Sequence, residues 1–475
     1  MSARGRACEA VVVGSGPNGL AAALTLAEAG VHVRVLEAAA TPGGGCRSDA
    51  RTLPGFVHDA CAAIHPVTVA SPFFRKQQIE RHVEFVHSPA ALAHPFDDGT
   101  AALLLRDVRA TDAQLGAGGS WARTMGPLVS DAPALLEDLL APLLKFPRHP
   151  LAFARFAPLA LLPATLFARG ALRSARARAL FAGLAAHAMI PLEAPGSAAF
   201  GLMLGLLGHH VGWPFPRGGA GRIVDFLVER ICAHGGEIVT GHEVRALSEL
   251  PADALKFFDV TPRQFVRLAG DALTSSQARP YERFRYGPGV FKIDYALRAP
   301  IPWCANECAS AATVHLGGTL EEIAHSERDA WRGVRSARPF VLLAQHSLFD
   351  ASRAPDGMHT AWAYCHVPHG DGGDFTDAIE AQIERFAPGF RECIAARHTT
   401  GAMQMQAYNA NYIGGDIGGG AATLWQTLAR PRLALNPYRT PLAGVYLCSS
   451  STPPGPGVHG MSGVGAAVKG IWDRG

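Results

Sequence analysis

Apolar residues near the start of the chain follow the pattern of a strand, a tight turn and a helix. Residues 11–13 are all valine, a β-branched run typical of a buried parallel strand, which we expect to end at Gly14. Apolar residues then recur at helical spacing over 20–27, and Gly30 ends this helix. A second apolar strand is predicted at 31–36, so the chain begins with a strand, helix, strand unit.

Farther along, strand-like and helix-like patterns alternate. Residues 94–107 predict a hairpin that turns at Asp97 to Gly99, and 131–213 are mainly helical in pattern. Residues 216–244 predict a glycine turn, an amphipathic helix and a strand that ends near Val244. The remaining predicted elements are strands at 290–297, 339–347 and 359–367, a helix at 374–386, a strand at 445–448 and a helix that starts near Met461. These patterns predict a layer of antiparallel strands and helices inserted between parts of the first domain.

Composition places the chain among globular proteins. Of 475 residues, 48% are hydrophobic and 17% are charged, which argues against a disordered chain, and this length predicts two or three domains. The net charge of +3 is small, and the sequence has no Lys/Arg-rich run, zinc-finger spacing or RNA-binding aromatic motif. We therefore expect no nucleic-acid partner.

Cysteine usage and the first residues bear on the cellular compartment. The nine cysteines are scattered without a C-x-x-C pair, so neither a disulfide framework nor a redox-active dithiol is expected. Cys304 and Cys308 have no nearby histidine ligands and are interpreted as loop thiols, so no metal site is predicted. Few residues precede the first strand, which leaves no room for a signal peptide and favours a cytoplasmic protein.

Residues 151–190 allow two interpretations. This stretch is rich in Leu, Ala, Phe and Arg, and Pro158, Pro163 and Gly170 break it into short helices. Its apolar side could dip into a membrane interface while its arginines meet anionic headgroups, which would make the protein a peripheral membrane protein. The alternative, which we favour, is a packed helical subdomain whose arginines face water.

Three glycines after the first strand carry the strongest functional signal. Gly14, Gly16 and Gly19 spell G-x-G-x-x-G, and Glu37 follows 18 positions after the third glycine. In such a motif the first glycine allows the tight turn, the second lets the backbone approach a pyrophosphate and the third lets helix and strand pack closely. The helix N-terminus attracts the phosphates, and the acidic side chain accepts hydrogen bonds from ribose hydroxyls while repelling a 2′-phosphate. The unit is therefore predicted to bind a dinucleotide.

The other glycine-rich stretches differ in context. Residues 438–472 predict a strand, a Ser/Pro/Gly loop and a helix N-terminus, which together form a second cradle that tolerates anions. The glycines at 218–221 follow Trp213 and prolines rather than a β-branched strand, so they are not interpreted as a second dinucleotide fingerprint.

Three stretches together carry a resemblance to a known family. "PNGLAAALTLAEAG…VLEAAATPGGGCRS", "PRGGAGRIVDFLVERICAHGGEI" and "YRTPLAGVYLCSSSTPPGPGVHGMSG" resemble the phytoene desaturase-like, FAD-dependent oxidoreductases, in the same order and over essentially the full length. The resemblance implies an α/β fold: a Rossmann-type FAD-binding domain, of the two-dinucleotide-binding-domain flavoprotein type, with an inserted α+β substrate domain. The FAD-binding domain would comprise residues 1–75, 214–262 and 428–475, and the substrate domain residues 76–213 and 263–427.

The same resemblance implies a set of residues that bind FAD. Gly14, Gly16 and Gly19 would hold the pyrophosphate, Glu37 the adenosine ribose, and Val244 would contribute backbone near the adenine. Residues Ser449 to Thr452 and Gly460 to Gly463 would line the flavin end, where a helix N-terminus stabilises negative charge on the reduced ring. The full set of expected cofactor-binding residues is Gly14, Gly16, Pro17, Asn18, Gly19, Glu37, Gly43, Gly44, Gly45, Arg47, Val244, Ser449, Ser450, Gly460, Met461 and Gly463.

The chain departs from the family pattern at two places. A run of strands often follows the position of Val244 in the family, whereas here the sequence passes quickly to the next element. The usual Gly-Ala-Ser-like strand end is Cys448-Ser449-Ser450. These changes leave the expectation of FAD in place, but a substrate cannot be carried over from carotenoid desaturation.

Three residues are candidates for catalysis. His459 stands one residue before a cradle glycine and could act as a proton acceptor or a substrate clamp near neutral pH. His65 follows the second glycine motif, the run Gly43 to Gly45, and could reach the same cavity, and Tyr412 precedes a glycine-rich segment that could run beside the substrate. For each, the alternative is a purely structural role. His366, on a predicted strand, is interpreted as structural.

The expected activity is that of an FAD-dependent oxidoreductase, a dehydrogenase, desaturase or oxidase. It would remove a hydride from an organic, largely apolar small molecule and pass electrons to oxygen, a quinone or another external acceptor. Two alternatives stay open: a redox-neutral flavin-dependent isomerase, and a non-catalytic regulatory protein that binds FAD. The sequence leaves the oligomeric state undetermined.

Overall fold

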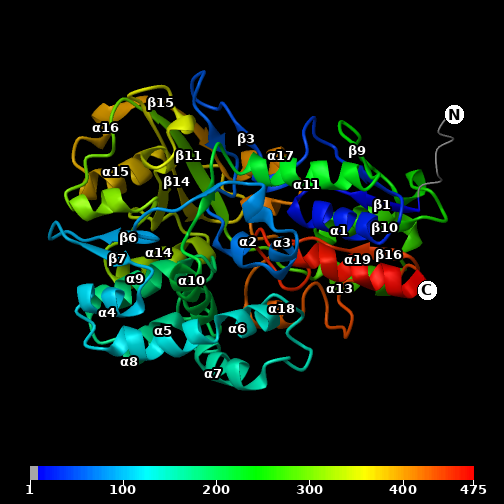
Figure 1. The fold of residues 1–475 in the computed structure, drawn as a ribbon, viewed down its shortest axis with the longest axis horizontal. Coiled ribbons are helices and arrows are strands. Elements are labelled where there is room, and N and C mark those ends of the chain that lie inside the picture. Colours follow the sequence, from blue (N-terminus) through cyan, green and yellow to red (C-terminus); the bar gives the residue numbers. More distant parts are fainter. Residues whose placement is uncertain (1–8, 475) are drawn as a thin grey trace.

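Two sheets organise the chain, and they lie toward opposite ends of its long axis (Figure 1). The computed structural model describes residues 9–474. The first sheet has five strands, all parallel, in the order β16-β10-β1-β2-β9. In chain order these strands are β1 (Ala10–Val13), β2 (Val33–Leu36), β9 (Glu237–Val239), β10 (Leu255–Phe258) and β16 (Val445–Leu447). Three separate segments of the chain therefore build one sheet.

Helices cover both faces of the parallel sheet. On one face, apolar side chains of the sheet pack against α1 (Pro17–Glu28), α11 (Gly221–Ala233) and α19 (Met461–Arg474). On the other face they pack against α12 (Pro262–Ala269) and α13 (Ser275–Glu282). The blue α1 and the red α19 run side by side in Figure 1, although they come from opposite ends of the chain. This arrangement confirms the predicted Rossmann-type α/β fold.

The second sheet has seven strands in the order β15-β11-β14-β13-β12-β6-β7. Every neighbouring pair is antiparallel except β12 and β6, so the sheet is mixed. In chain order these strands are β6 (Leu92–Pro95), β7 (Ala101–Leu104), β11 (Gly289–Leu297), β12 (Thr313–Leu316), β13 (Val341–Ala344), β14 (His359–Val367) and β15 (Ile394–Thr400). Two short antiparallel pairs lie outside it: β3 (Ser48–Asp49) with β4 (His58–Asp59), and β5 (Phe85–Val86) with β8 (Phe215–Pro216).

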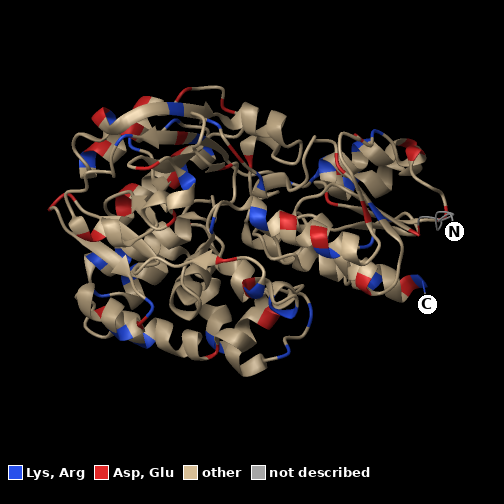
Figure 2. Ribbon diagram, turned by 45° about the horizontal axis from the view of Figure 1, so that its top comes forward, with Lys and Arg blue, Asp and Glu red and all other residues tan. Residues whose placement is uncertain are grey.

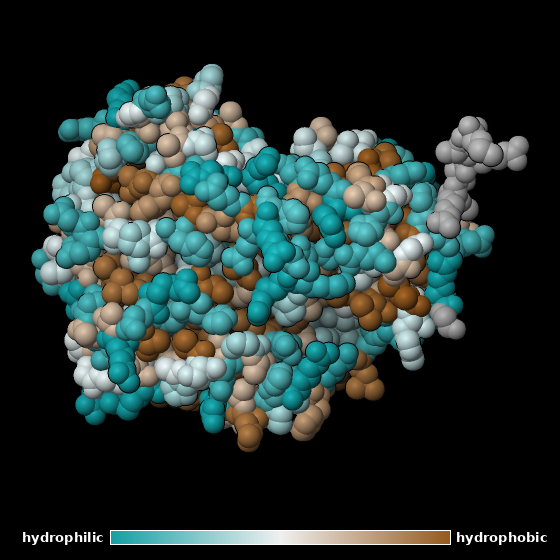
Figure 3. Space-filling model, in the orientation of Figure 1, coloured by the Kyte–Doolittle hydropathy of each residue, from teal (hydrophilic) through white to brown (hydrophobic). Residues whose placement is uncertain are grey.

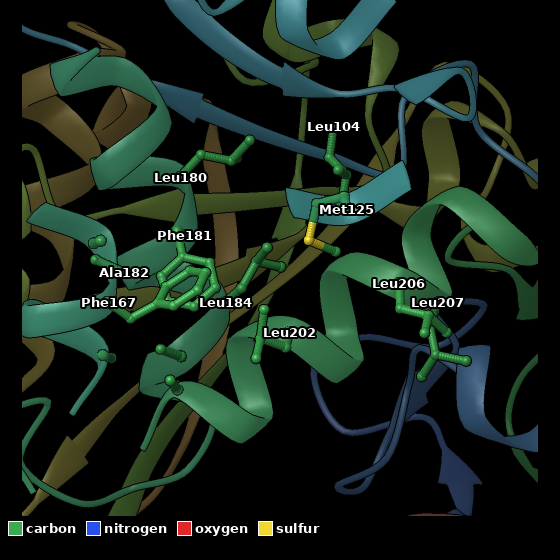
Figure 4. Packing of buried hydrophobic residues seen from close by; sticks show 14 of the residues in the cluster. Leu104, Met125, Phe167, Leu180, Phe181, Ala182, Leu184, Leu202, Leu206 and Leu207 are labelled. Carbon is green, nitrogen blue, oxygen red and sulfur yellow. The ribbon is translucent and has the colours of Figure 1, made fainter. Parts of the chain in front are cut away.

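A helical layer packs beside the second sheet and contains the largest apolar core. Phe181 and Leu184 of one helix lie near Leu202 of the next (Figure 4). Met125 packs against that second helix, since a Cβ at Gly205 would lie 2.8 Å from its terminal methyl carbon. The layer contains α4 (Val108–Gln114), α5 (Ser120–Ser130), α6 (Ala132–Leu139), α7 (Pro150–Ala160), α8 (Ala164–Ala171), α9 (Ala175–Ala186), α10 (Ala198–His210) and α14 (Leu320–Arg332). The other helices are α2 (Pro66–Ala70), α3 (Pro72–Lys76), α15 (Thr376–Phe386), α16 (Phe390–Cys393), α17 (Ala402–Tyr408) and α18 (Leu424–Leu428).

Most predicted elements are present, with two differences. The hairpin β6–β7 turns at Asp97 to Gly99 and β14 spans the predicted 359–367, but the strand expected to end near Val244 ends at Val239. Residues 240–254 instead form loops and a short 3₁₀ helix, which agrees with the missing run of strands. The helices α12 and α13 were assigned to the insertion, yet they pack against the parallel sheet. The domain boundaries themselves stay predictions.

Along the ribbon in Figure 2, Lys and Arg residues are interspersed with Asp and Glu residues throughout the chain, in keeping with the small net charge. Among residues 9–474, no single helix is long and apolar enough to cross a membrane. Helices α7 and α8 are long and apolar enough only when taken together, and they are bent by 103° at the break between them. The buried residues of α8 and α9 belong to the core of Figure 4, so most of 151–190 is packed as favoured from the sequence.

Candidate functional site

The loop between β1 and α1 has the backbone geometry of a dinucleotide cradle. Gly14 has a φ of +96°, a conformation that favours glycine, and Gly16 caps α1 without a side-chain hydrogen bond. A Cβ at Gly19 would lie 2.2 Å from the carbonyl oxygen of Gly14, so only glycine lets strand and helix approach this closely. The three glycines thus perform the turn, the open approach and the close packing that their spacing predicts.

Glu37 lies at the end of β2, where its carboxylate faces the glycine loop. It accepts hydrogen bonds from the Ser15 backbone N–H at 3.0 Å, the Ser15 hydroxyl at 2.5 Å and the Ala39 N–H at 2.8 Å. Arg47 Nη2 lies 3.3 Å from Glu37 Oε1, and the Arg47 guanidinium also lies over the ring of Tyr408. The backbone N–H and the hydroxyl of Ser15 on the loop therefore hold the acidic side chain beside the cradle.

Asp259 is a second carboxylate at the glycine loop, and no motif in the sequence marks it. It follows β10, and its Oδ2 accepts a hydrogen bond from the Gly19 N–H at 3.0 Å. A Cβ on Gly16 would lie 2.5 Å from the same oxygen. Burial raises the pKa of Asp259 to about 7, and the nearby charge of Glu37 adds to this shift. The only available sequence signal was an acidic residue at the end of an apolar strand.

A single cavity of about 740 Å³ connects the glycine loop with the second sheet. At one end its wall includes the glycine loop and Glu37, and at the other it includes Trp213, Trp362 and Tyr364. The rings of Trp362 and Tyr364, which share one face of β14, are stacked with centroids 5.3 Å apart. The cavity therefore has a cradle suited to a dinucleotide and an aromatic region suited to an apolar molecule.

The second glycine motif forms the floor between these two regions. Gly44 approaches the first motif closely, since a Cβ there would lie 3.1 Å from the Gly16 Cα. The Tyr408 hydroxyl donates a hydrogen bond to the Gly44 carbonyl at 2.8 Å, and a Cβ at Gly45 would lie 2.2 Å from the Tyr412 hydroxyl. The segment 408–412 thus packs directly onto the glycines, and both tyrosines line the cavity.

The C-terminal cradle is only partly at the cavity. Ser449 and Ser450 line it, but Gly460, Met461 and Gly463 do not. A Cβ at Gly463 would lie 1.9 Å from the carbonyl oxygen of Asn18, so this glycine serves the packing of α19 against α1. These three residues were expected at the flavin end, and the structure instead places them in the helix packing behind it.

Eleven of the expected cofactor-binding residues line the cavity: Gly14, Gly16, Pro17, Asn18, Glu37, Gly44, Gly45, Arg47, Val244, Ser449 and Ser450. Gly19 and Gly43 lie behind it. Gly19 contacts Gly14 and Asp259, and a Cβ on Gly43 would lie 2.9 Å from Val224 of α11. Val244 reaches the cavity from the loop after β9 rather than from a strand.

His65 is part of the cavity wall. Its Nδ1 lies 3.1 Å from the Thr68 hydroxyl oxygen, and that hydroxyl lies 2.6 Å from the Val458 carbonyl, to which it donates. Because the single hydroxyl hydrogen of Thr68 is donated to Val458, the Thr68 oxygen must accept from His65. We therefore place the ring proton of His65 on Nδ1, and Nε2 carries none. Burial lowers the pKa of His65 to about 4, which keeps the ring neutral near pH 7.

His459 does not line the cavity, and both of its ring nitrogens have partners. Nδ1 accepts a hydrogen bond from the Met461 N–H at 3.0 Å, and Nε2 lies 3.0 Å from the Gly455 carbonyl. Burial lowers the pKa of this histidine to about 4. The geometry therefore corrects the expectation of an acid or base near neutral pH: His459 joins the loop to the first turn of α19.

Tyr412 lines the cavity, and its hydroxyl pairs with the Cys61 thiol. Burial raises the pKa of this tyrosine well above its ordinary value, so the hydroxyl keeps its proton and acts only as a hydrogen-bonding group. His366, interpreted as structural, is buried with its Nδ1 2.8 Å from Glu327 Oε2 and does not line the cavity.

A buried charge cluster behind the aromatic region was missed from the sequence. Lys292 and Asp294 form an ion pair on β11, and Asp294 also lies 3.6 Å from His58 Nδ1. The Lys292 ammonium lies 5.8 Å from the ring centroid of Trp362, which lines the cavity. The sequence signal for this cluster was two charged residues at alternate positions of an apolar strand. Such residues share one face of the strand, and charged side chains are rarely buried without partners.

Comparison with known proteins agrees with this geometry. A model of NAD(P)-binding Rossmann-like domains matches residues 12–76, which agrees with the Rossmann-type fold of this segment. The pyridine nucleotide-disulfide oxidoreductase domain-containing protein 2 of Rattus norvegicus is 25% identical, and that of Mus musculus is 26% identical. Each similarity covers 97% of this chain and 92% of the relative.

Solved structures share the fold over the whole chain. An oxidoreductase from Methanosarcina mazei is 17% identical with a TM-score of 0.64, covering 97% of this chain and 99% of that one. Putrescine oxidase bound to putrescine is 17% identical with a TM-score of 0.62, covering 98% and 99%. Cyclohexylamine oxidase from Brevibacterium oxydans is 13% identical with a TM-score of 0.59, covering 98% of each chain. The chain thus has the fold of these oxidoreductases, with a Rossmann-like dinucleotide-binding domain and an added mixed sheet.

Proposed function

We propose that this protein is an FAD-dependent oxidoreductase of the phytoene desaturase-like type that acts on a largely apolar organic molecule. The observation that carries the proposal is the single cavity that joins the dinucleotide cradle to the aromatic wall. A molecule bound beside Trp362 would lie in the same cavity as the end of a dinucleotide held at Gly16 and Glu37. Sharing one cavity is the geometry that transfer between a cofactor and a substrate requires.

The residues of the cradle fit FAD. Gly16 leaves the approach to the helix N-terminus free of a side chain, and Glu37 suits an unphosphorylated ribose. The wall continues beyond this point through Gly44, Gly45 and Ser449, which leaves space for a second half of the cofactor. When bound, FAD supplies the acceptor for a hydride. The protein residues would hold the cofactor and exclude water.

Apolar side chains support an apolar substrate. Met189, Phe200, Met203 and Leu204 line the cavity together with the aromatic wall. Met189 has a φ of +54°, an uncommon conformation for a residue other than glycine, and such residues concentrate at functional sites. We propose that His65 and Tyr412, both neutral near pH 7, position the substrate by contact and hydrogen bonding.

The electrons would leave to oxygen, a quinone or another external acceptor. Two alternatives give different outcomes with the same material: a redox-neutral isomerase converts substrate without consuming an acceptor, and a regulatory FAD-binding protein converts nothing. Anaerobic mixing with a panel of apolar and polar compounds distinguishes them. Bleaching of the flavin by a compound supports the oxidoreductase, and product formation without net acceptor use supports the isomerase.

An exposed apolar rim supports peripheral contact of an otherwise cytoplasmic protein with a membrane. Phe146 is 87% exposed, Leu151 78% and Leu435 91%, and apolar side chains project at the lower edge of Figure 3. Lys145 and Arg148, next to Phe146, are exposed and could meet anionic headgroups. Flotation with vesicles of anionic phospholipid tests this: Phe146→Glu with Leu435→Glu should abolish binding, whereas Val468→Glu on α19 should not.

Cofactor binding is tested with matched glycine variants. Gly16→Val should abolish FAD binding, because its side chain would enter the space against Asp259 and the approach of the pyrophosphate. Gly170→Ala is the control, since a Cβ there meets nothing within 4 Å. The purified protein should be yellow with noncovalently bound FAD. A colourless, folded protein that FAD cannot reconstitute would contradict the proposal.

A further inference from the structure

A pair of histidines forms a polar patch in the apolar part of the cavity wall. His187, immediately after α9, lines the cavity, and its Nε2 lies 3.1 Å from Nε2 of His315 on β12. The Trp213 ring meets both imidazoles edge-on, with centroids 5.7 and 5.8 Å away. The two rings are therefore held in place by their mutual hydrogen bond and by an aromatic side chain.

The hydrogen-bond partners determine which nitrogen carries each proton. A bond between two Nε2 atoms requires a proton on one of them and a lone pair on the other. His315 Nδ1 is buried and has no partner among residues 9–474. If this nitrogen carried a proton, a buried N–H donor would be unsatisfied, which costs more than a bare acceptor. We assign the shared proton to His315 Nε2, and His187 then carries its own proton on Nδ1.

The Nδ1 of His187 is available to a ligand. It has no hydrogen-bond partner among the described residues and is not among the nitrogens enclosed by protein. Burial lowers the pKa of His187 to about 3, and the nearby His366 contributes in the same direction. The ring therefore stays neutral at physiological pH, and its Nδ1–H is a donor only.

Thr313 adds a second unsatisfied group to this patch. It stands two positions before His315 on β12, so the two side chains share one face of the strand. Thr313 also lines the cavity, and its buried hydroxyl has no partner among the described residues. A buried hydroxyl without a partner is unusual in folded proteins, and a bound molecule that supplies an oxygen would satisfy it.

We propose that His187 and Thr313 form a recognition subsite for an uncharged oxygen acceptor, such as a carbonyl, carried by an otherwise apolar substrate. The Nδ1–H of His187 attracts a carbonyl oxygen but cannot accept a hydrogen bond from an ammonium group, so His187 favours an uncharged oxygen acceptor over a cationic amine. This inference rests on the proposed function in one respect: the proposed function places the substrate in this cavity.

Matched probes test the subsite on the folded protein as purified, and its FAD content is measured in the same sample. Acetophenone and α-methylstyrene have the same shape, but only acetophenone carries a carbonyl oxygen. Ligand-observed NMR titration should give acetophenone the tighter binding, and His187→Phe should weaken acetophenone at least about tenfold while changing α-methylstyrene less than about twofold. Thr313→Val should weaken acetophenone in the same direction, because it removes the hydroxyl and keeps the shape.

A conservative variant controls for misfolding. An asparagine amide can place its N–H near the position of a histidine Nδ1, so His187→Asn should keep the preference for acetophenone while losing the bond to His315. Long-range ¹H–¹⁵N spectra of the histidine rings give an independent measurement: they should show His187 protonated at Nδ1 and His315 at Nε2.

The outcomes separate this inference from the proposed function. Absence of FAD together with a preference for acetophenone at His187 would overturn the function and support the subsite. Bound FAD with equal affinity for the two probes, or a His187 ring bare at Nδ1, would overturn the subsite and leave the function standing.

Discussion

The carboxylate of Asp259 accepts a hydrogen bond from the Gly19 N–H at 3.0 Å, although the two residues are 240 positions apart in the sequence. This bond ties the end of β10 to the first turn of α1, where the positive end of a helix favours a negative group. The same helix end is where the phosphates of a dinucleotide would bind. Asp259 and the cofactor would thus carry negative charge at one helix N-terminus.

Stability and cofactor affinity should both depend on the protonation of Asp259. Its pKa is raised to about 7 in the folded protein, so its contribution to stability is full at low pH and is lost as pH rises toward 7. Asp259→Asn stays neutral, so its free energy of unfolding relative to wild type should increase by about 3 kcal/mol between pH 5 and pH 8. Urea unfolding of the cofactor-free proteins measures this difference.

The phosphates should raise the pKa of Asp259 further, because they bring more negative charge to the same helix end. Wild-type affinity for FAD should therefore fall as pH rises above 7, and Asp259→Asn should show a weaker dependence. Fluorescence titration with FAD at several pH values measures it. Parallel pH profiles for the two proteins would show that Asp259 does not sense the cofactor.

His459→Ala should affect stability rather than turnover. It leaves the Met461 N–H and the Gly455 carbonyl without these partners, at a cost of about 1–3 kcal/mol. His459→Asn should recover part of this loss, because its amide oxygen can accept from Met461. Thermal melts and the rate of flavin reduction by substrate report the two effects separately. A drop in that rate of about 100-fold at unchanged flavin content would restore a catalytic role.

The pair of Glu327 and His366 should be a strong structural contact. Both side chains are 1% exposed, with His366 Nδ1 2.8 Å from Glu327 Oε2, so Glu327→Ala leaves a buried imidazole without its partner. We expect a loss of about 3 kcal/mol in the free energy of unfolding. The exposed pair of Glu137 and His149 is the control, and Glu137→Ala should cost less than about 0.5 kcal/mol. Equal effects of the two variants would refute the difference in burial as the cause.

Reduction by NADH or NADPH should be slow. Within residues 9–474, only the unit of β1, its glycine turn and α1 has the geometry of a dinucleotide-binding site. The proposed FAD occupies this unit. The glycines at 218–221 follow β8, a two-residue antiparallel strand, and a Cβ at Gly219 would lie 2.4 Å from the Ser48 hydroxyl. Anaerobic stopped-flow mixing measures the rate. Rapid, saturable bleaching with either nucleotide would reveal a nicotinamide site.

Local patterns in the sequence were sufficient for the cradle. The turn at Gly14, the packing at Gly19 and the acidic end of β2 at Glu37 depend on neighbouring residues, so spacing alone predicts them. The hairpin β6–β7 and the strand β14 follow from alternation in the same way.

Long-range packing produced the rest. Asp259 reaches the glycine loop only because β10 pairs with β1, and no local pattern encodes that pairing. Gly463 looked like part of an anion cradle, yet it is small because α19 crosses α1 there. His187 and His315 lie 128 positions apart, and their contact depends on how α9 packs near β12. A catalytic role was expected for His459, but a histidine just before a helix can also accept a hydrogen bond from the first turn of that helix, as His459 does from the Met461 N–H.

The close crossing of α1 and α19 sets the order in which the protein can mature during translation. Helix α1 leaves the ribosome early, but the helix that covers it begins at Met461, hundreds of residues later. At ordinary rates of elongation the interval is on the order of a minute. Throughout that time the apolar side of α1 lacks its final neighbour and the parallel sheet lacks β16. A nascent chain should therefore depend on chaperones for this surface, and the cofactor can be retained only after synthesis is nearly complete.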